Sequence, residues 1–244
     1  MNDEIKETAK ATQEIAKAAT TAIEATEKLG KFVGNLVSEP LEEIIGILAD
    51  KLKFIRWERQ VRFSEKCKEL IEKRGLSKFR VIPPKFALPL IENASLEEND
   101  ELQDLWAKLL FTSIDPIKEF PRQGYIDILK QLEVIDVKVL KIIYEEYMEI
   151  PHQSLSSDSI FTTPEDPTYH PIFYHKIFNK INIENKIYFS VIDNLMRMRL
   201  VTYHVHSGNI EIQEGFNRFS SIGGYKIISI TSLGVEFVEA CIKE

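Results

Sequence analysis

The sequence predicts a mainly α protein, α+β overall, in which an N-terminal helical module precedes a C-terminal winged-helix-like domain with a β-hairpin. Two observations predict this class. Apolar residues recur at helical spacing through most of residues 38–149. Two short runs rich in β-branched residues, 200–206 and 225–230, then follow near the C-terminus, with glycine-containing bends around their connection.

The chain is long enough for more than one module. Its 244 residues are 44% hydrophobic, which is sufficient to bury a core in one to three modules. We predict an Ala/Thr-rich amphipathic helix with an apolar connector at 1–37, a helical module at 38–133 and the winged-helix-like domain at 134–244. The last of these contains a Pro- and Ser-rich loop at 151–171.

Composition restricts the class of partner and the compartment. The formal net charge is −7, which gives no global attraction to nucleic acid. Cys67 and Cys241 are far apart without metal-ligand spacing, so we interpret them as reduced thiols. Residues 1–28 contain no apolar signal-peptide core, and the chain has no run of about 18 apolar residues. We expect a cytoplasmic protein, with peripheral contact at the inner membrane as an alternative.

The segment before residue 30 is rich in Ala, Thr, Lys and Glu, and its predicted apolar face is made of small side chains. Burying such a face contributes little, since stabilisation scales with apolar area. We expect a helix that is ordered only against a partner, a second copy or a membrane. A frayed, solvated N-terminal helix is the alternative.

One long helix is predicted from Pro40 to Arg74. Ser38 can cap its first amides, and Gly75 suits the left-handed position after its last turn. Its first half carries an apolar stripe at helical spacing. The stripe comprises Leu41, Ile44, Ile45, Leu48, Leu52 and Ile55.

Cations replace this stripe in the second half of the same helix. Residues 50–80 contain eleven Lys and Arg against five Asp and Glu, a local charge of +6. We predict contact with an anionic membrane or a partner through five of them, Arg56, Arg59, Arg62, Lys66 and Lys73. The alternative is that they pair with acids of their own helix or of segment 97–104. Internal pairing would remove the outward-acting role.

Shorter helices follow. Pro83-Pro84 predicts an extended turn before a short helix, and acids at 98–101 start another that Asp115-Pro116 ends. Residues 123–132 and 136–149 read as two more helices, with Asp136 as a cap of the second. After the 151–171 loop we predict helices at 172–180 and 184–199, the two strands, and a final helix capped by Thr231.

A winged helix raises the alternative of DNA binding. The expected recognition helix carries Lys186, Arg197 and Arg199 as possible contacts. Residues 134–244, however, contain ten basic and fourteen acidic side chains, a balance of −4. Because phosphate neutralisation dominates protein–DNA affinity, nucleic acid is an unfavoured partner. Contact with a protein is the favoured use of this domain.

No residue constellation indicates an enzyme. His204 and His206 share one face of a predicted strand, but spacing implies no further zinc ligands. No nucleophile elbow, Walker-type loop or dinucleotide-binding glycine pattern is present. We therefore expect a protein with no catalytic residues, metal, cofactor or small-molecule substrate, and with a protein partner or a second copy of itself as its target.

Three separated motifs carry a family resemblance. They are Glu39-Pro-Leu-Glu-Glu-Ile-Ile-Gly with the aromatic-basic run 54–62, then Val81-Ile-Pro-Pro-Lys, then residues 94–110 closing on Asp115-Pro116. In this order they resemble the abortive infection alpha (Abi-alpha) family over roughly residues 28–240. The resemblance implies a bacterial protein that defends against phage through abortive infection. It implies no catalytic residues, and it casts Pro83, Pro84 and Trp106 as determinants of the fold.

The leading hypothesis is thus a non-enzymatic phage-defence protein that acts through amphipathic helices on a membrane surface or a protein partner. A winged-helix regulator that binds DNA and a scaffold that oligomerises are the alternatives.

Overall fold

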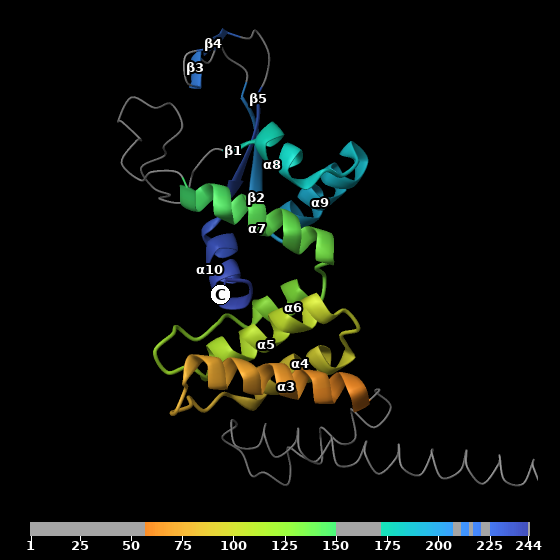
Figure 1. Ribbon diagram of the computed structural model, residues 1–244, viewed down its shortest axis with the longest axis vertical. Coiled ribbons are helices and arrows are strands. Elements are labelled where there is room, and N and C mark those ends of the chain that lie inside the picture. The colour runs from red at the N-terminus through yellow and green to blue at the C-terminus, as the bar shows by residue number, and fades with distance from the viewer. Residues whose placement is uncertain (1–56, 150–171, 207–210, 215–216, 221–224, 244) are drawn as a thin grey trace, which may run out of the picture. The chain divides into compact units, whose positions relative to one another are not determined.

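The structure is a computed structural model, and it describes residues 57–149, 172–206, 211–214, 217–220 and 225–243 (Figure 1). The chain forms two compact units, Met1–Gln131 and Leu132–Glu244, which we call unit 1 and unit 2. The predicted segment 1–37, the apolar stripe Leu41–Ile55, Arg56 and the 151–171 loop lie outside the described residues. The mainly α class with a small β component is confirmed.

Unit 1 is built from four described helices, α3 (Trp57–Arg74), α4 (Pro84–Leu96), α5 (Asp100–Ile114) and α6 (Gly124–Leu129). The predicted ends are confirmed where local chemistry sets them. Gly75 has φ +62°, and the Leu76 amide donates to the Ile71 carbonyl at 3.1 Å, so α3 ends in a left-handed cap. Asp115 is extended and stops α5.

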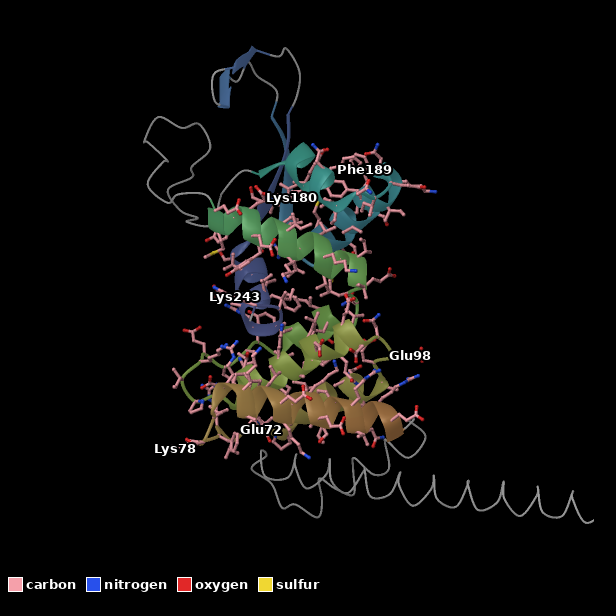
Figure 2. The ribbon with its side chains drawn as sticks, viewed as in Figure 1. Glu72, Lys78, Glu98, Lys180, Phe189 and Lys243 are labelled. Carbon is pink, nitrogen blue, oxygen red and sulfur yellow. The ribbon has the colours of Figure 1, made fainter. Side chains whose placement is uncertain are left out.

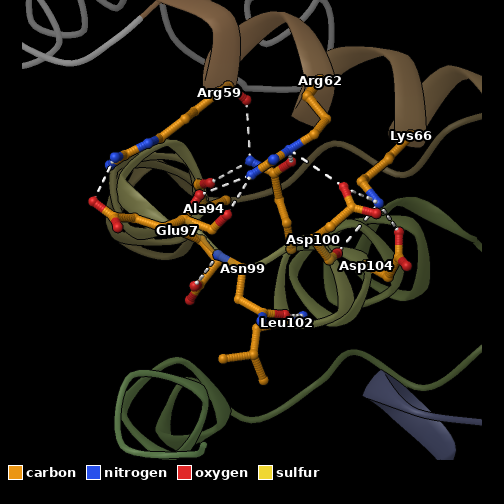
Figure 3. Close-up of polar contacts among 11 residues, drawn as sticks. Arg59, Arg62, Lys66, Ala94, Glu97, Asn99, Asp100, Leu102 and Asp104 are labelled. Carbon is orange, nitrogen blue, oxygen red and sulfur yellow. Dashed lines mark hydrogen bonds and ion pairs between the residues drawn. The ribbon is translucent and has the colours of Figure 1, made fainter. Parts of the chain in front are cut away.

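Helix α5 begins at Asp100, two residues after Glu98, the first of the acids that the sequence analysis placed at its start. Asn99 is the N-cap, and its Oδ1 accepts the amide of Leu102 at 3.1 Å. Pro83 is extended, with ψ 140°, and Pro84 occupies the first turn of α4, as the sequence predicts. These caps fix where α4 ends and α5 begins, and both ends face α3 (Figure 3).

The core of unit 1 lies between α3, α4 and α5. Trp106 is only 2% exposed, in agreement with its predicted packing role. Its companions in the core are Phe63, Cys67, Ile82, Phe86, Leu90, Ile91, Leu109 and Leu110. Burial raises the pKa of the Cys67 thiol far above its usual range, so this cysteine is an inert apolar side chain.

Unit 2 combines helices with a small antiparallel sheet. Its elements are α7 (Val134–Glu149), β1 (Ile172–Phe173), α8 (Tyr174–Ile181), α9 (Asn185–Arg197), β2 (Val201–His206), β3 (Glu211–Glu214), β4 (Asn217–Ser220), β5 (Tyr225–Ile230) and α10 (Ser232–Cys241). Three strands form one sheet in the order β1-β5-β2, and β3 pairs with β4 separately.

The two predicted strands are confirmed as β2 and β5, which pair from Val201↔Ile230 to His206↔Tyr225. The prediction that residues 172–180 form one helix is wrong at its start, because Ile172 and Phe173 pair with β5 as β1. A two-residue strand has no periodicity of its own, so only its partner defines it. Strands β3 and β4 were not predicted either. The winged-helix assignment stays a prediction.

The last helix of unit 2 is placed by a close backbone contact. Thr231 caps α10 as predicted, because its Oγ1 accepts the Gly234 amide at 2.9 Å. The carbonyl of Leu200 in turn accepts the Thr231 amide at 3.0 Å. A Cβ on Gly234 would stand 2.1 Å from that carbonyl oxygen, so only glycine fits where α10 crosses the start of β2.

Gly234→Ala should therefore destabilise unit 2 by about 1–3 kcal/mol, the usual range for overpacking. The matched control is Gly124→Ala, because a Cβ at Gly124 meets nothing within 4 Å. The measurement is alkylation of the buried Cys241 in a urea series, read by peptide mass spectrometry, with Cys67 as the reference for unit 1. Equal urea midpoints for Cys241 in both variants would contradict the close contact.

A buried carboxylate joins α7 to α9. Asp136 is 3% exposed, and its Oδ2 accepts the Glu133 amide at 2.9 Å and Asn194 Nδ2 at 2.8 Å. The predicted helix start at Asp136 is wrong by two residues: α7 begins at Val134, and Asp136 bonds back to the Glu133 amide from inside the first turn. Desolvation by burial raises the pKa of Asp136, and the two hydrogen bonds oppose this shift.

A raised folded-state pKa gives Asp136 a pH-dependent effect on stability. Its contribution is fully present below the unfolded carboxyl pKa, about 3.9, and is lost as the pH rises through the folded value. Asp136→Asn should thus gain stability relative to wild type as the pH rises from about 4 to neutral. Hydrogen exchange of α9 peptides, compared between variants at each pH, measures this. The control is Asp193→Asn, at an exposed position of α9, and an identical trend in both variants would refute the assignment.

Candidate interaction surface

Five of the six cations of α3 fall into two groups with different surroundings, and the sixth, Lys68, is exposed between them. Arg59, Arg62 and Lys66 point toward the junction of α4 and α5, where they are bonded within unit 1 (Figure 3). Lys73 and Arg74, in the last turn of the same helix, are exposed. The two groups therefore have to be considered separately as candidate sites.

The first group binds the end of α4 and the start of α5. Arg59 donates to the Leu96 carbonyl at 3.0 Å and pairs with Glu98. Arg62 Nη2 donates at 3.1 Å to the carbonyls of Glu97 and Glu98, and its Nε lies 3.4 Å from Asp100 Oδ1. Lys66 pairs with Asp100 at 3.1 Å and with Asp104.

Helix polarity explains this arrangement. The last carbonyls of α4 have no partner within the helix and carry partial negative charge, so guanidinium groups are favoured there. Acids at the start of α5 are favoured by the positive end of that helix. The cations of α3 thus find carbonyls and carboxylates already gathered at one place.

A buried amide completes the junction. Gln103 is 0% exposed, and its Nε2 donates at 3.0 Å to the carbonyls of both Arg59 in α3 and Ala94 in α4. Its Oε1 accepts Arg62 Nε at 2.6 Å. One side chain of α5 therefore satisfies groups on two other helices, α3 and α4. We call the set Gln103, Arg59, Arg62, Lys66 and their partners at 94–104 the polar junction.

The sequence allowed two roles for these cations, contact with an external anion or pairing inside the protein. For Arg59, Arg62 and Lys66 the structure shows internal pairing, with acids of segment 97–104. Contact with an external anion would require these bonds to break. The physical reason is register: the cations lie at α3 positions directly opposite the α4–α5 connection. Arg56 lies outside the described residues, and Lys73 alone of the predicted cations is described as exposed.

Gln103→Leu should destabilise unit 1 by about 2–4 kcal/mol, since it removes three hydrogen bonds that the buried amide makes to Arg59, Ala94 and Arg62. The matched control is Gln131→Leu, at an exposed position, which should change stability by less than about 0.5 kcal/mol. Urea unfolding followed by tryptophan fluorescence measures this, because Trp57 and Trp106 both belong to unit 1 and the chain has two Trp. A Gln103→Leu midpoint equal to the control would show that the junction contributes nothing.

The second group of cations lies at the other end of α3. Figure 2 shows Lys78, just beyond this end, and Glu98, in the polar junction, at opposite ends of unit 1. The loops that connect α3 to α4 and α5 to α6 leave the helices at the same end (Figure 1). Both loops carry cations and exposed apolar side chains. Together with the last turn of α3 they form what we call the basic–apolar surface, which comprises Lys73, Arg74, Lys78, Lys118, Phe79, Val81, Ile117 and Phe120.

Arg80 holds the two loops together. Its amide donates to the Ile114 carbonyl at 2.6 Å, and its Nη2 donates to the Lys118 carbonyl. Its guanidinium lies over the Phe120 ring at 5.7 Å from the centroid, and that ring packs on Phe86 at 4.9 Å. The loops are therefore anchored to the core of unit 1.

A groove of about 430 Å³ runs between the loops. Phe111 lines it together with the end of α3 and the two loops, and Arg74, Lys78 and Lys118 supply its positive charge. Lys118 Nζ lies 6.0 Å from the centroid of the Phe111 ring. Asp115 also lines the groove, but it is only 8% exposed and its Oδ1 accepts the Ile117 amide at 2.9 Å. The accessible charge is thus mainly positive.

The residues considered for DNA binding are not gathered in unit 2. Lys186 is exposed in the first turn of α9, and Arg197 is in the last turn, roughly 16 Å away along the axis. Arg197 donates to Asn194 Oδ1 at 2.7 Å. Arg199 has φ +60°, and its carbonyl accepts Thr231 Oγ1. The backbone of Arg199 therefore belongs to the turn after α9, and its side chain is exposed.

Among the described residues, no three His, Cys, Asp or Glu side chains are grouped so that they could hold a metal ion. In the same part of the chain, no helix has both the length and the apolar character needed to cross a bilayer.

The family model for abortive infection alpha matches residues 58–241, which span nearly all of the described structure in both units. The chain belongs to the abortive infection alpha family. The family expected from the sequence motifs is thus confirmed, and the match begins at residue 58, not near residue 28 as expected. Comparison with curated proteins and with solved structures gave no significant match.

Sequence reasoning missed most of the basic–apolar surface of this family member. Lys73 was included, but Lys78, Phe79, Ile117 and Lys118 were not. A signal was present, because residues 73–82 contain four Lys and Arg and no acid. The second loop begins at residue 115, more than 30 residues further along the chain, and only the fold shows that the two loops are adjacent.

Proposed function

We propose that this abortive infection alpha protein acts in phage defence by binding rather than by catalysis. Its contact with a membrane surface or a protein partner is the basic–apolar surface of unit 1. The observation that carries the proposal is the contrast between the two groups of α3 cations. Arg59, Arg62 and Lys66 are bonded within the polar junction. Lys73 and Arg74 are exposed, at the end of α3 where the two loops carry exposed apolar side chains.

The availability of these cations supports a binding role. Within the described residues, Lys73, Arg74, Lys78 and Lys118 form no ion pair, whereas Arg59, Arg62 and Lys66 each form at least one. No internal ion pair has to break before these cations meet an external anion. The positive charge also stands out in a chain whose net charge is −7.

The apolar side chains support the same conclusion. Ile117 is 91% exposed and Val81 is 55% exposed, on adjacent loops of one unit. Burying a fully exposed Ile stabilises a complex by about 1.5–3 kcal/mol, so these residues would add affinity to the electrostatic attraction. Single exposed apolar residues are ordinary, but several of them on two loops that also carry free cations are typical of an interaction site.

The amphipathic-helix hypothesis is retained in a narrower form. Its apolar stripe, Leu41 to Ile55, lies outside the described residues. Of its cations, Arg59, Arg62 and Lys66 belong to the polar junction, and Lys73 belongs to the basic–apolar surface. The proposed contact is therefore centred on the C-terminal end of α3 and the loops beside it.

Charge reversal at the surface tests this function. Lys78→Glu with Lys118→Glu should abolish protection of a bacterial host against a phage that the wild-type protein restricts, because two free cations are replaced by acids. Protein level, Trp fluorescence and Cys67 protection should remain as in wild type, since both side chains lie outside the core. Plaque counts on hosts that express each variant provide the measurement.

The matched control is Lys141→Glu with Lys186→Glu, which changes the net charge equally at exposed positions of unit 2. It should protect as wild type does. Full protection by the surface variant would refute the proposal. Loss of protection in the control alone would instead favour a contact through α9, where the DNA-binding alternative places Lys186.

A further inference from the structure

We infer that the basic–apolar surface docks on the headgroup layer of an anionic lipid bilayer, with loops 76–81 and 115–120 entering the interface. The inference rests on the proposed function and names the partner of that surface. Four observations carry it: the kind of cation, the placement of the apolar side chains, the anchoring of the loops and the local charge.

The cations are of the kind that favours a lipid surface. Three of the four free ones, Lys73, Lys78 and Lys118, are lysines. Lysine is depleted in protein–protein interfaces, where Arg and aromatic residues are enriched, because its ammonium group is strongly hydrated. An anionic leaflet needs no desolvation of the ammonium, and each basic residue near it improves partitioning about fivefold, roughly 1 kcal/mol.

The apolar side chains lie on loops rather than on one flat patch. Ile117 and Phe120 belong to one loop, and Phe79 and Val81 belong to the other. The groove of about 430 Å³ lies between these loops and is lined by Lys78, Ile117 and Lys118 among others. Apolar side chains on two loops that also carry cations fit a layer of small mobile headgroups, which can fill the groove. A rigid protein partner would have to match both loops and the groove in shape.

The loops are held in place before contact. Arg80 bonds the Ile114 and Lys118 carbonyls, and Phe120 packs on Phe86 of the core. Little conformational freedom would therefore be lost on binding, which favours affinity. Segments 72–82 and 115–122 together contain six Lys and Arg against three Asp and Glu, a charge of +3. One of the three acids, Asp115, is buried against the Ile117 amide.

The test is cosedimentation of the full chain with vesicles of phosphatidylglycerol and phosphatidylcholine in equal parts, and with vesicles of phosphatidylcholine alone. Wild type should bind the anionic vesicles preferentially, and the binding should weaken as salt is raised. Lys78→Glu with Lys118→Glu should weaken partitioning at least about 25-fold, from about fivefold per removed cation. Lys141→Glu with Lys186→Glu should leave it within about twofold of wild type.

A second pair of variants separates insertion from simple charge attraction. Val81→Ser with Ile117→Ser should weaken binding while leaving its salt dependence unchanged, because the cations remain. Anionic binding that is equal in wild type and in the Lys78→Glu, Lys118→Glu variant would overturn the inference, whatever other segment of the chain is then responsible. Equal binding of the wild-type protein to neutral and to anionic vesicles would also overturn the inference.

The vesicle assay and the phage assay distinguish this inference from the proposed function. If the surface variant loses phage protection but wild type does not bind anionic vesicles, the lipid inference fails. The proposed function then stands, with a protein as the partner. If the variant binds vesicles less than wild type but still protects fully, the lipid contact exists and the proposed function fails.

Discussion

The arrangement of unit 1 depends on one buried amide. Gln103 bonds the backbone carbonyls of Arg59 and Ala94 and accepts the guanidinium of Arg62, so α3, α4 and α5 can pack together in only one register. A shift of α3 by one residue would rotate its side chains by about 100° and leave these groups unpaired in the interior. The register that satisfies Gln103 also determines which cations of α3 face inward. The position of the outward-facing cations is therefore a consequence of how the core polar groups are satisfied.

The ion pairs of the polar junction orient side chains more than they stabilise the fold. The acids that pair with Arg59 and Arg62 are 78% and 65% exposed, and exposed pairs contribute about 0–1 kcal/mol each. The bonds of Gln103 are worth more because water cannot replace them. The buried amide thus fixes the packing, and the ion pairs set the direction of long side chains. Arg59, Arg62 and Lys66 are therefore bonded within unit 1. The cations at the C-terminal end of α3, Lys73 and Arg74, are available for contact.

Local chemistry made much of the fold predictable. Gly75, Thr231 and Asp115-Pro116 ended or capped helices as expected, because each acts through bonds to nearby backbone. Side chains that act across elements could not be assigned in this way. Gln103 sits among apolar residues of α5, and its polar character alone does not indicate two carbonyl partners on other helices. The basic–apolar surface could not be assigned either, since its two loops are neighbours only in the folded unit, where α3 packs on α5 and Arg80 bonds the Ile114 and Lys118 carbonyls.

The net charge of −7 does not prevent the basic–apolar surface from approaching an anionic target. At physiological ionic strength the Debye length is about 8 Å, so a charged surface interacts mainly with the residues nearest to it. At contact, those residues would be the cations of the two loops. Acids that lie further than this distance are largely screened, and their remaining repulsion disfavours other orientations. The charge of the basic–apolar surface would therefore turn this part of unit 1 toward an anionic target before apolar contacts form. Because Lys78 and Lys118 are separated by the groove, both loops must reach the target together, which makes the approach selective for direction as well as for charge.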